Sequence, residues 1–191
     1  MPTGKMTVVY DACVLYPSIL RDFLLTLAKS GIFRAKWTDD IQDEWSRNLL
    51  RNRPDLGGAV IDRIRSNMEA AIPDALVSKK TYRHLIDAVT LPDPGDRHVV
   101  AAAIASKASY VITFNLFDFP ADKLNQFGVS ALHPDEFVLR LIALDSEEVL
   151  ECLEEQRARY RKPPQTLSEL LAKLSKDGLL KSSAEIQRMV T

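Results

Sequence analysis

Cysteine, glycine and long hydrophobic runs are all scarce in this 191-residue sequence. The two cysteines, Cys13 and Cys152, form neither a CxxC pair nor a Cys/His cluster, which argues against a structural zinc site and a disulfide-framed secreted domain. The longest strongly apolar run covers residues 99–105, whereas a membrane-spanning helix needs about twenty residues. Residues 1–6 show no signal-peptide core. We therefore expect a cytoplasmic protein without a membrane partner.

Net charge is also small, because 25 lysines and arginines nearly cancel 26 aspartates and glutamates, leaving −1 at pH 7. This balance excludes a strongly basic coat, so a polyanionic partner must be held by a local patch. The hydrophobic share of 46% and the low counts of 7 glycines and 10 prolines exclude disordered, collagen-like and low-complexity chains. The length suits one domain that buries about 70% of its unfolded surface, with a small appendage.

Short β-rich runs alternate with stretches of helical periodicity along most of the chain. The expected strands are 7–10, 32–37, 75–77, 110–113 and 129–132, and the expected helices are 17–30, 38–51, 54–71, 97–107, 121–125 and 134–143. This alternation predicts an α/β fold with a mainly parallel central sheet. We expect a domain of residues 6–145 followed by a wholly helical extension of residues 146–191.

The predicted extension carries its own helix signals. Thr166 with Glu169 and Ser182 with Glu185 have the spacing of capping boxes, which mark helix N-termini. We expect the extension to fold against the α/β domain and to bury six leucines: Leu150, Leu153, Leu167, Leu170, Leu171 and Leu174.

Two acidic residues in the first 50 positions are candidates for chemistry. Asp11 directly follows the first predicted strand, and in an open parallel sheet ligands gather at the carboxyl ends of strands. A local cap on the next loop is the alternative. Glu44 lies four residues after Asp40 on the same helical face. Its alternative role is an exposed ion pair with Arg47, which would contribute little to stability.

The segment Asp93-Pro94-Gly95-Asp96 has the residues of a type II turn, which brings its ends within about 7 Å. Two carboxylates held that close at a helix N-terminus repel each other unless a cation or the helix dipole relieves them. Mg²⁺ and Mn²⁺ bind carboxylate and water oxygens, so the pattern indicates a divalent-metal site. Capping of the helix by one of the two acids is the alternative.

Polar residues also follow the buried strand predicted at 110–113. Thr113, Asn115 and Asp118 place a hydroxyl, an amide and a carboxylate near the same sheet edge as Asp11. Asparagine and aspartate are common in turns, so purely local roles are the alternative for each.

Taken together, these motifs resemble the PIN-domain family of metal-dependent ribonucleases, in particular the VapC-type toxins of type II toxin–antitoxin pairs. The similarity covers about residues 7–140 and is carried, in the family's order, by VVYDA at 8–12, EWSRNL at 44–49, DPGDRHVVAAA at 93–103 and VITFNLFDFP at 111–120. It implies a PIN-like three-layer α/β/α sandwich with a C-terminal helical appendage.

The resemblance implies that Asp11, Glu44 and Asp96 are the first three acids of a Mg²⁺ or Mn²⁺ site. The family often has an acid two residues after the strand-ending threonine, where this chain has Asn115, so Asp118 is the expected fourth catalytic carboxylate. Three residues are expected to support the site: Asp93, Thr113 and Asn115. The implied reaction is the hydrolysis of RNA phosphodiesters by metal-activated water.

Four basic residues near these motifs are candidates for phosphate contacts, with ordinary solvated surface as the alternative: Arg47, Arg51, Lys79 and Lys80. The resemblance also implies a small antitoxin protein as partner and a homodimer. A non-catalytic PIN-like module that binds RNA or protein remains the alternative function. A haloacid-dehalogenase-like phosphatase fits poorly, since Cys13 stands where that family needs a second aspartate. No catalytic role is expected for His84, His98 or His133.

Overall fold

The computed structural model of the protein describes residues 5–191 and is built around a four-stranded sheet. Its strands are β1 (Thr7–Tyr10), β2 (Arg34–Lys36), β3 (Tyr110–Ile112) and β4 (Ser130–Leu132). They lie in the order β2-β1-β3-β4, and each neighbouring pair is parallel. The carboxyl ends of all four strands therefore face the same edge of the sheet.

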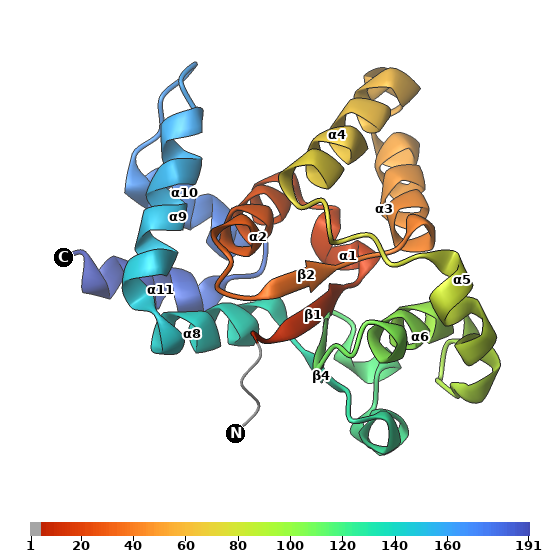
Figure 1. The fold of residues 1–191 in the computed structure, drawn as a ribbon. Helices are drawn as coiled ribbons and strands as arrows, with labels where there is room; N and C mark the ends of the chain where they lie inside the picture. The colour runs from red at the N-terminus through yellow and green to blue at the C-terminus, as the bar shows by residue number, and fades with distance from the viewer. Residues whose placement is uncertain (1–4) are drawn as a thin grey trace.

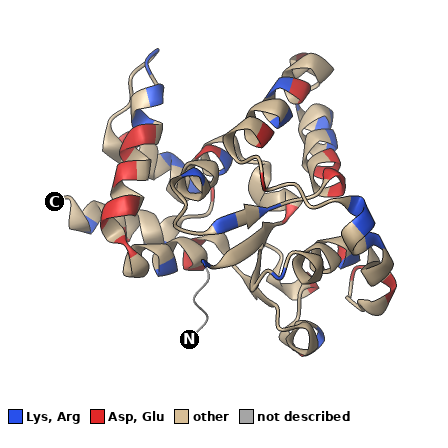
Figure 2. Cartoon of the chain, viewed as in Figure 1, with Lys and Arg blue, Asp and Glu red and all other residues tan. Residues whose placement is uncertain are grey.

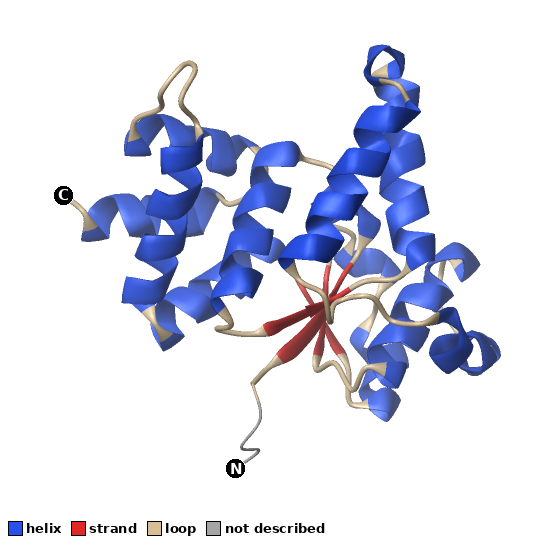
Figure 3. Cartoon of the chain, turned by 45° about the horizontal axis from the view of Figure 1, so that its top comes forward, coloured by secondary structure: helices blue, strands red, loops and turns tan. Residues whose placement is uncertain are grey.

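Helices connect the strands and lie on both sides of the sheet (Figures 1 and 3). The α-helices are α1 (Ala12–Leu15), α2 (Ser18–Ser30), α3 (Asp39–Asn52), α4 (Gly58–Ala71), α5 (Lys79–Tyr82), α6 (Arg97–Ala105), α7 (Ala121–Leu124), α8 (Pro134–Leu144), α9 (Ser146–Arg159), α10 (Leu167–Lys176) and α11 (Leu180–Met189). Short 3-10 helices are η1 (Pro54–Leu56), η2 (Arg83–Ala88), η3 (Pro94–Asp96), η4 (Leu116–Asp118) and η5 (Asn125–Phe127). The expected α/β/α architecture is confirmed.

The central strands lack polar alternation because both of their faces are covered. Val8, Val9 and Tyr10 of β1 are fully buried, as are Val111 and Ile112 of β3. A strand buried on both faces needs apolar side chains on both, which is typical of parallel sheets. Helix α6 packs against both strands, and its run of residues 99–103 is wholly buried.

Several predicted helix ends are confirmed by their hydrogen bonds. The Thr38 hydroxyl accepts a hydrogen bond from the Ile41 backbone N–H at 3.1 Å and caps α3. Gly31, at φ 84°, ends α2 in the left-handed conformation that glycine adopts easily. Thr166 and Glu169 form the expected capping box at the start of α10.

Three local expectations were wrong. Ser182 does not begin a helix; it lies inside α11, and its hydroxyl donates to the Asp135 carboxylate. Residues 75–77 form no strand, and Leu76 makes only an isolated parallel bridge to Trp37. The helix expected from residue 54 starts at Gly58, because Gly57, with φ 69° and ψ 160°, is not helical and separates it from η1.

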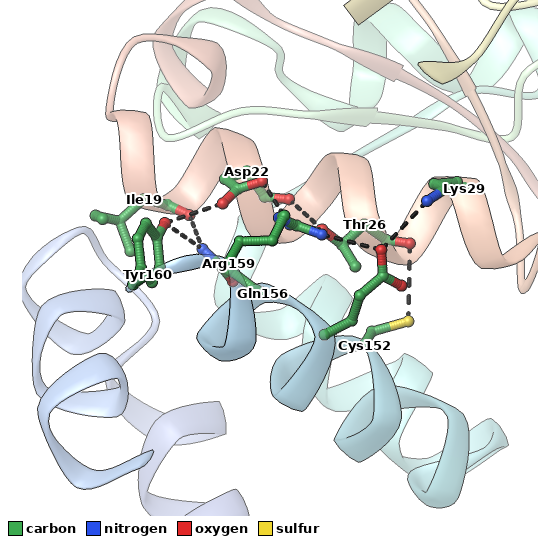
Figure 4. A network of polar contacts seen from close by, with 9 residues as sticks. Ile19, Asp22, Thr26, Lys29, Cys152, Gln156, Arg159 and Tyr160 are labelled. Atoms are coloured by element: carbon green, nitrogen blue, oxygen red, sulfur yellow. Dashed lines mark hydrogen bonds and ion pairs between the residues drawn. The ribbon is translucent and has the colours of Figure 1, made fainter. Parts of the chain in front are cut away.

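The C-terminal extension is tied to the α/β domain by a polar network between α9 and α2 (Figure 4). The Arg159 guanidinium donates to the Asp22 carboxylate and to the Thr26 hydroxyl, both at 2.7 Å. The Gln156 side-chain amide donates to the Ile19 carbonyl oxygen at 3.0 Å. These contacts join residues more than 130 positions apart in the chain, so the extension and the first helices form one packed unit.

The extension also shares the hydrophobic core. Four of the six leucines expected to be buried are buried, and Leu150 and Leu167 are only partly so. The Asp135 carboxylate at the start of α8 accepts the backbone N–H groups of Lys181 and Ser182, each at 2.8 Å. An aspartate from another helix therefore stabilises the N-terminus of α11.

Acidic and basic residues both occur on many of the helices (Figure 2). Acidic residues are concentrated along α9, and basic residues occur at α5. No single face is uniformly basic in this view. Across residues 5–191, no helix combines the length and the apolar character needed to cross a bilayer.

One close contact joins the extension to the end of β3. Gly178 lies between α10 and α11 at φ 106°, and a Cβ there would lie 2.5 Å from Cε1 of Phe114. The Phe114 ring also packs edge-on against His133, with ring centroids 5.2 Å apart. The chain segment that follows β3 is therefore held between the α/β domain and the extension.

We expect Gly178→Ala to lower the free energy of unfolding by about 2–3 kcal/mol, since it adds both left-handed backbone strain and a clash with Phe114. Gly128 is the matched control, because it has φ 68° but a Cβ added there would meet no atom within 4 Å. Gly128→Ala should lower the free energy of unfolding by about 1 kcal/mol through strain alone. Urea denaturation measures both, and equal losses would show that Phe114 moves aside freely.

Candidate active site

Asp11 is fixed at the carboxyl end of β1 by donors on both of its carboxylate oxygens. Its Oδ1 accepts the Ala12 backbone N–H at 2.7 Å, so the residue does cap α1. Its Oδ2 accepts the Thr113 hydroxyl at 2.7 Å and the Cys13 thiol at 3.2 Å. Only 3% of Asp11 is exposed. The side chain is thus held in place by neighbours from both β1 and β3.

The Asp93–Asp96 segment is a 3-10 turn rather than the expected type II turn, because Gly95 does not adopt a positive φ. Asp93 Oδ1 accepts the Gly95 backbone N–H at 2.7 Å and caps this turn. Asp96 occupies the N-cap position of α6 but makes no side-chain capping hydrogen bond. The capping role therefore belongs to Asp93, and the Asp96 carboxylate remains free to face its neighbours.

The carboxylates predicted from the sequence come together around Asp96. Burial raises the pKa of Asp96 to about 7, with further contributions from the negative charges of Asp11, Asp93, Asp118 and Glu44. The pKa of Glu44 is also raised, first by burial and then by Asp11 and Asp93, while Arg47 opposes the shift. Each predicted acid is therefore close enough to influence another through its charge.

These carboxylates approach without closing into a preformed metal cage. Within residues 5–191, no group of three or more His, Cys, Asp or Glu side chains lies close enough to hold a metal ion. Ionised carboxylates repel at short range, which favours side-chain positions that keep them apart. The donor set itself, made of carboxylate oxygens, is the set that Mg²⁺ and Mn²⁺ prefer.

A cleft of about 790 Å³ opens beside these acids. Glu44 and Arg47 of α3 line one side, and Asp93 and Asp96 line another. Asp11 and Asp118 are not part of its lining. The cleft therefore exposes some of the acids to solvent, while Asp11 is buried outside its lining.

Two further residues line the cleft: Arg65, which the sequence analysis missed, and His98, for which it expected no catalytic role. Arg65 of α4 donates to Asp43 at 2.6 Å and brings a second helix to the cleft. Nε2 of His98 lies 3.8 Å from Oε2 of Glu44, and burial lowers the pKa of His98. No local pattern pointed to Arg65. His98 stands two residues after Asp96 in the first turn of α6, a spacing that does not by itself put the two side chains on one helical face.

The alternative ion pair between Glu44 and Arg47 is not formed. Within the described chain, the nitrogen close to the Glu44 carboxylate belongs to His98, and Nε of Arg47 donates instead to the Asp43 carbonyl oxygen at 3.3 Å. Glu44 is half-buried rather than free in solvent. Its position in the cleft is therefore not explained by a surface ion pair.

The other candidate phosphate contacts differ in their placement. Lys79 Nζ lies 2.9 Å from a carboxylate oxygen of Asp40, which partly neutralises its charge. Arg51 and Lys80 are exposed and do not line the cleft. Arg47 is thus the predicted RNA-contacting residue that the structure brings into the cleft.

The residues after β3 organise the sheet edge through Thr113. Its buried hydroxyl donates to Asp11 and accepts the Asn115 backbone N–H at 3.0 Å. Asn115 itself is exposed, and Asp118 is half-buried in η4. Burial and the nearby Asp11 raise the pKa of Cys13 to about 12, so its thiol stays protonated and is no nucleophile at neutral pH.

Two parts of the chain match known protein families. A family model described as "PIN domain" matches residues 7–116, and a second described as "VapC50 C-terminal domain" matches residues 134–188. A protein of Mycobacterium tuberculosis (strain ATCC 25618 / H37Rv) named "Putative ribonuclease VapC50" is 40% identical over 76 residues. That match covers 40% of this chain and 45% of the relative. No solved structure matches the chain.

The raised pKa of Asp96 predicts a specific pH dependence of stability. The folded-state pKa of about 7 exceeds the ordinary value of 3.8, so between these pH values the folded protein binds the extra proton. Folding stability therefore falls as the pH rises towards 7. We expect Asp96→Asn, which cannot ionise, to be more stable than the wild type above pH 7, with an advantage that shrinks as the pH approaches 4.

Urea unfolding at several pH values, without divalent ions, measures this difference. Asp122→Asn removes the same charge from an exposed position on α7 and controls for net charge. A gain from Asp96→Asn that stays constant with pH would contradict the raised pKa of Asp96.

Proposed function

Because this chain belongs to the PIN domain family, we propose that it is a Mg²⁺- or Mn²⁺-dependent endoribonuclease that hydrolyses RNA phosphodiester bonds. One observation carries the proposal: at the carboxyl edge of a parallel sheet, burial and then the charges of four other acids raise the pKa of Asp96 to about 7. Such crowding is unfavourable for the isolated protein and is relieved by a bound cation.

Four residues would hold the metal: Asp11, Glu44, Asp96 and Asp118. A divalent ion there supplies a Lewis acid for the phosphate oxygens and lowers the pKa of the attacking water. Thr113 positions Asp11 through its 2.7 Å hydrogen bond and thereby keeps one carboxylate in a single orientation. Asp93, which caps η3, helps to place Asp96 at the start of α6.

Basic residues around the cleft would contact the RNA backbone. Arg47 lines the cleft directly, and Arg51 and Lys80 are exposed on the neighbouring helices α3 and α5. Lys79 would have to leave Asp40 to bind a phosphate, so its contribution is expected to be smaller. Phosphate contacts of this kind position the substrate and make binding sensitive to salt.

The role of a toxin from a type II toxin–antitoxin pair is part of the same proposal. It is supported by the PIN-domain match, by the match of residues 134–188 and by the name of the mycobacterial relative. In this role the protein would be cytoplasmic and would form a homodimer. It would also bind a small antitoxin protein. The division into a nuclease domain of residues 6–145 and an extension of residues 146–191 is also proposed.

A non-catalytic PIN-like module that binds RNA or protein is the second candidate. The absence of a close group of three acidic or imidazole side chains in residues 5–191 favours it. Incubation of the purified chain with single-stranded RNA and Mn²⁺ separates the two candidates. The nuclease proposal requires cleavage that EDTA stops and that Asp11→Asn abolishes.

We expect millimolar Mn²⁺ or Mg²⁺ to raise the Tm of the wild type, because an ion that binds only the folded state stabilises it. The variant Asp11→Asn/Asp96→Asn should show no comparable rise. Asp87→Asn/Asp122→Asn removes two exposed acids outside the cleft and should respond like the wild type. Equal shifts in all three proteins, measured by thermal denaturation, would show that Asp11 and Asp96 hold no metal.

The fourth position of the metal site is tested by comparing Asp118 with Asn115. We expect Asp118→Asn to lower RNA cleavage at least about tenfold, or about 1.4 kcal/mol, because it removes a charge. Asn115→Ala should cost less, since it removes only a neutral group. Cleavage is measured at saturating Mn²⁺ after unchanged melting has been established. A larger loss for Asn115→Ala would assign the fourth position to Asn115.

A further inference from the structure

Phe117 is the most exposed large hydrophobic side chain in residues 5–191, with 85% of its surface open to solvent. It lies in η4, the short turn that follows the end of β3. The adjacent Leu116 is 44% exposed. Burying an aromatic ring contributes about 1.5–3 kcal/mol, so a ring left in water is available to a partner.

The turn that carries Phe117 is held firmly on both sides. The Asp118 backbone N–H donates to the Asn115 carbonyl oxygen at 3.0 Å, and the Phe119 N–H donates to the Leu116 carbonyl oxygen at 3.2 Å. Phe119 is only 2% exposed and anchors the far side of the turn. On the near side, Phe114 packs against His133 and Gly178. Phe117 is therefore held outwards by an ordered turn rather than by a loose loop.

The same turn is connected to the carboxylate site by a chain of hydrogen bonds. Thr113 donates to Asp11 at 2.7 Å, and its hydroxyl oxygen accepts the Asn115 N–H at 3.0 Å. Phe117 follows Asn115 by two residues, and Asp118 comes directly after it. Phe117 is therefore the immediate neighbour in the chain of Asp118, whose charge acts on Asp96.

We propose that the Phe117 ring stacks on an unpaired base of the RNA substrate and so positions the strand for cleavage. This inference rests on the proposed function and adds a contact to the substrate outside the metal site. Unstacked bases of single-stranded RNA pack on aromatic side chains, and each such contact contributes about 1–3 kcal/mol. Phe117 is a positioning residue, because it touches the base and not the reacting phosphate.

The charge of the site explains why a stacking contact is useful there. The acids around Asp96 repel phosphate, and the whole chain has a net charge of −1. A neutral ring holds a nucleotide without adding to that repulsion. The exposed apolar surface at this turn consists of Phe117 and its neighbour Leu116, followed by the charged Asp118. One ring matches one base, whereas protein partners generally need a broader apolar patch.

The central experiment compares Phe117→Ala, Phe117→Leu and Phe117→Trp in the cleavage of a single-stranded RNA oligonucleotide. We expect Phe117→Ala and Phe117→Leu to raise KM about tenfold, which is about 1.4 kcal/mol, with little change in kcat. Phe117→Trp should keep the wild-type KM, because tryptophan also stacks. Leu144→Ala removes an apolar side chain that is 66% exposed at the end of α8 and should leave KM unchanged. A KM for Phe117→Ala equal to that of the wild type would overturn the inference.

A binding experiment provides a readout that does not depend on cleavage. A series of oligonucleotides, each with one abasic position, is titrated against Asp96→Asn and against Asp96→Asn/Phe117→Ala. One of the abasic positions should weaken binding to Asp96→Asn about tenfold. The same position should have little effect on binding to Asp96→Asn/Phe117→Ala. Equal losses in both proteins at every position would show that no base stacks on Phe117.

The two proposals fail in different ways. Absence of cleavage by the wild type, together with an abasic effect that depends on Phe117, would overturn the nuclease proposal and keep the stacking contact. Metal-dependent cleavage by the wild type, with KM unchanged in Phe117→Ala, would keep the nuclease and overturn the stacking contact. Self-association lost in Phe117→Ala while KM stays constant would assign the ring to a protein interface and also overturn the inference.

Discussion

Repulsion among carboxylates is the constraint on which the arrangement of this protein depends. Parallel strands align their carboxyl ends, so acids that follow β1 and β3 meet the acid at the start of α6. Three hydrogen-bond donors fix the Asp11 carboxylate, whereas the Asp96 side chain accepts no capping hydrogen bond from α6. Burial, together with the charges of the neighbouring acids, raises the pKa of Asp96 to about 7. Sites tuned for chemistry commonly reduce stability in this way.

The rest of the fold supports this edge of the sheet. Helix α9 is hydrogen-bonded along α2, and Asp135 of α8 holds the start of α11 (Figures 1 and 4). Between these contacts, Gly178 allows the Phe114 ring to pack where any side chain would collide with it. The extension therefore does more than add helices to the surface, because it also braces the turn that follows β3.

Recognition of a polyanion by this surface has to be local. The cleft places Arg47 and Arg65 among aspartates, and both arginines already contact acidic residues or backbone oxygens nearby. Such a surface offers individual contacts rather than a continuous positive field, so long-range steering contributes little. Binding then depends on bound cations, a few phosphate contacts and neutral stacking, which are interactions of short range.

The sequence alone was sufficient for the α/β class, the covered strands and the caps at Thr38 and Thr166, because these features depend on residue type and short spacing. It misjudged Ser182, whose partner Asp135 lies 47 positions away. It also missed Arg65, which reaches the cleft from a separate helix. Only the tertiary structure decided which acids approach Asp96 and that Asp93, rather than Asp96, serves as the cap. Local patterns placed the residues after β1 and β3 at one sheet edge. How closely each carboxylate approaches Asp96 depends on the packing of helices across the sheet, which short sequence spacing does not specify.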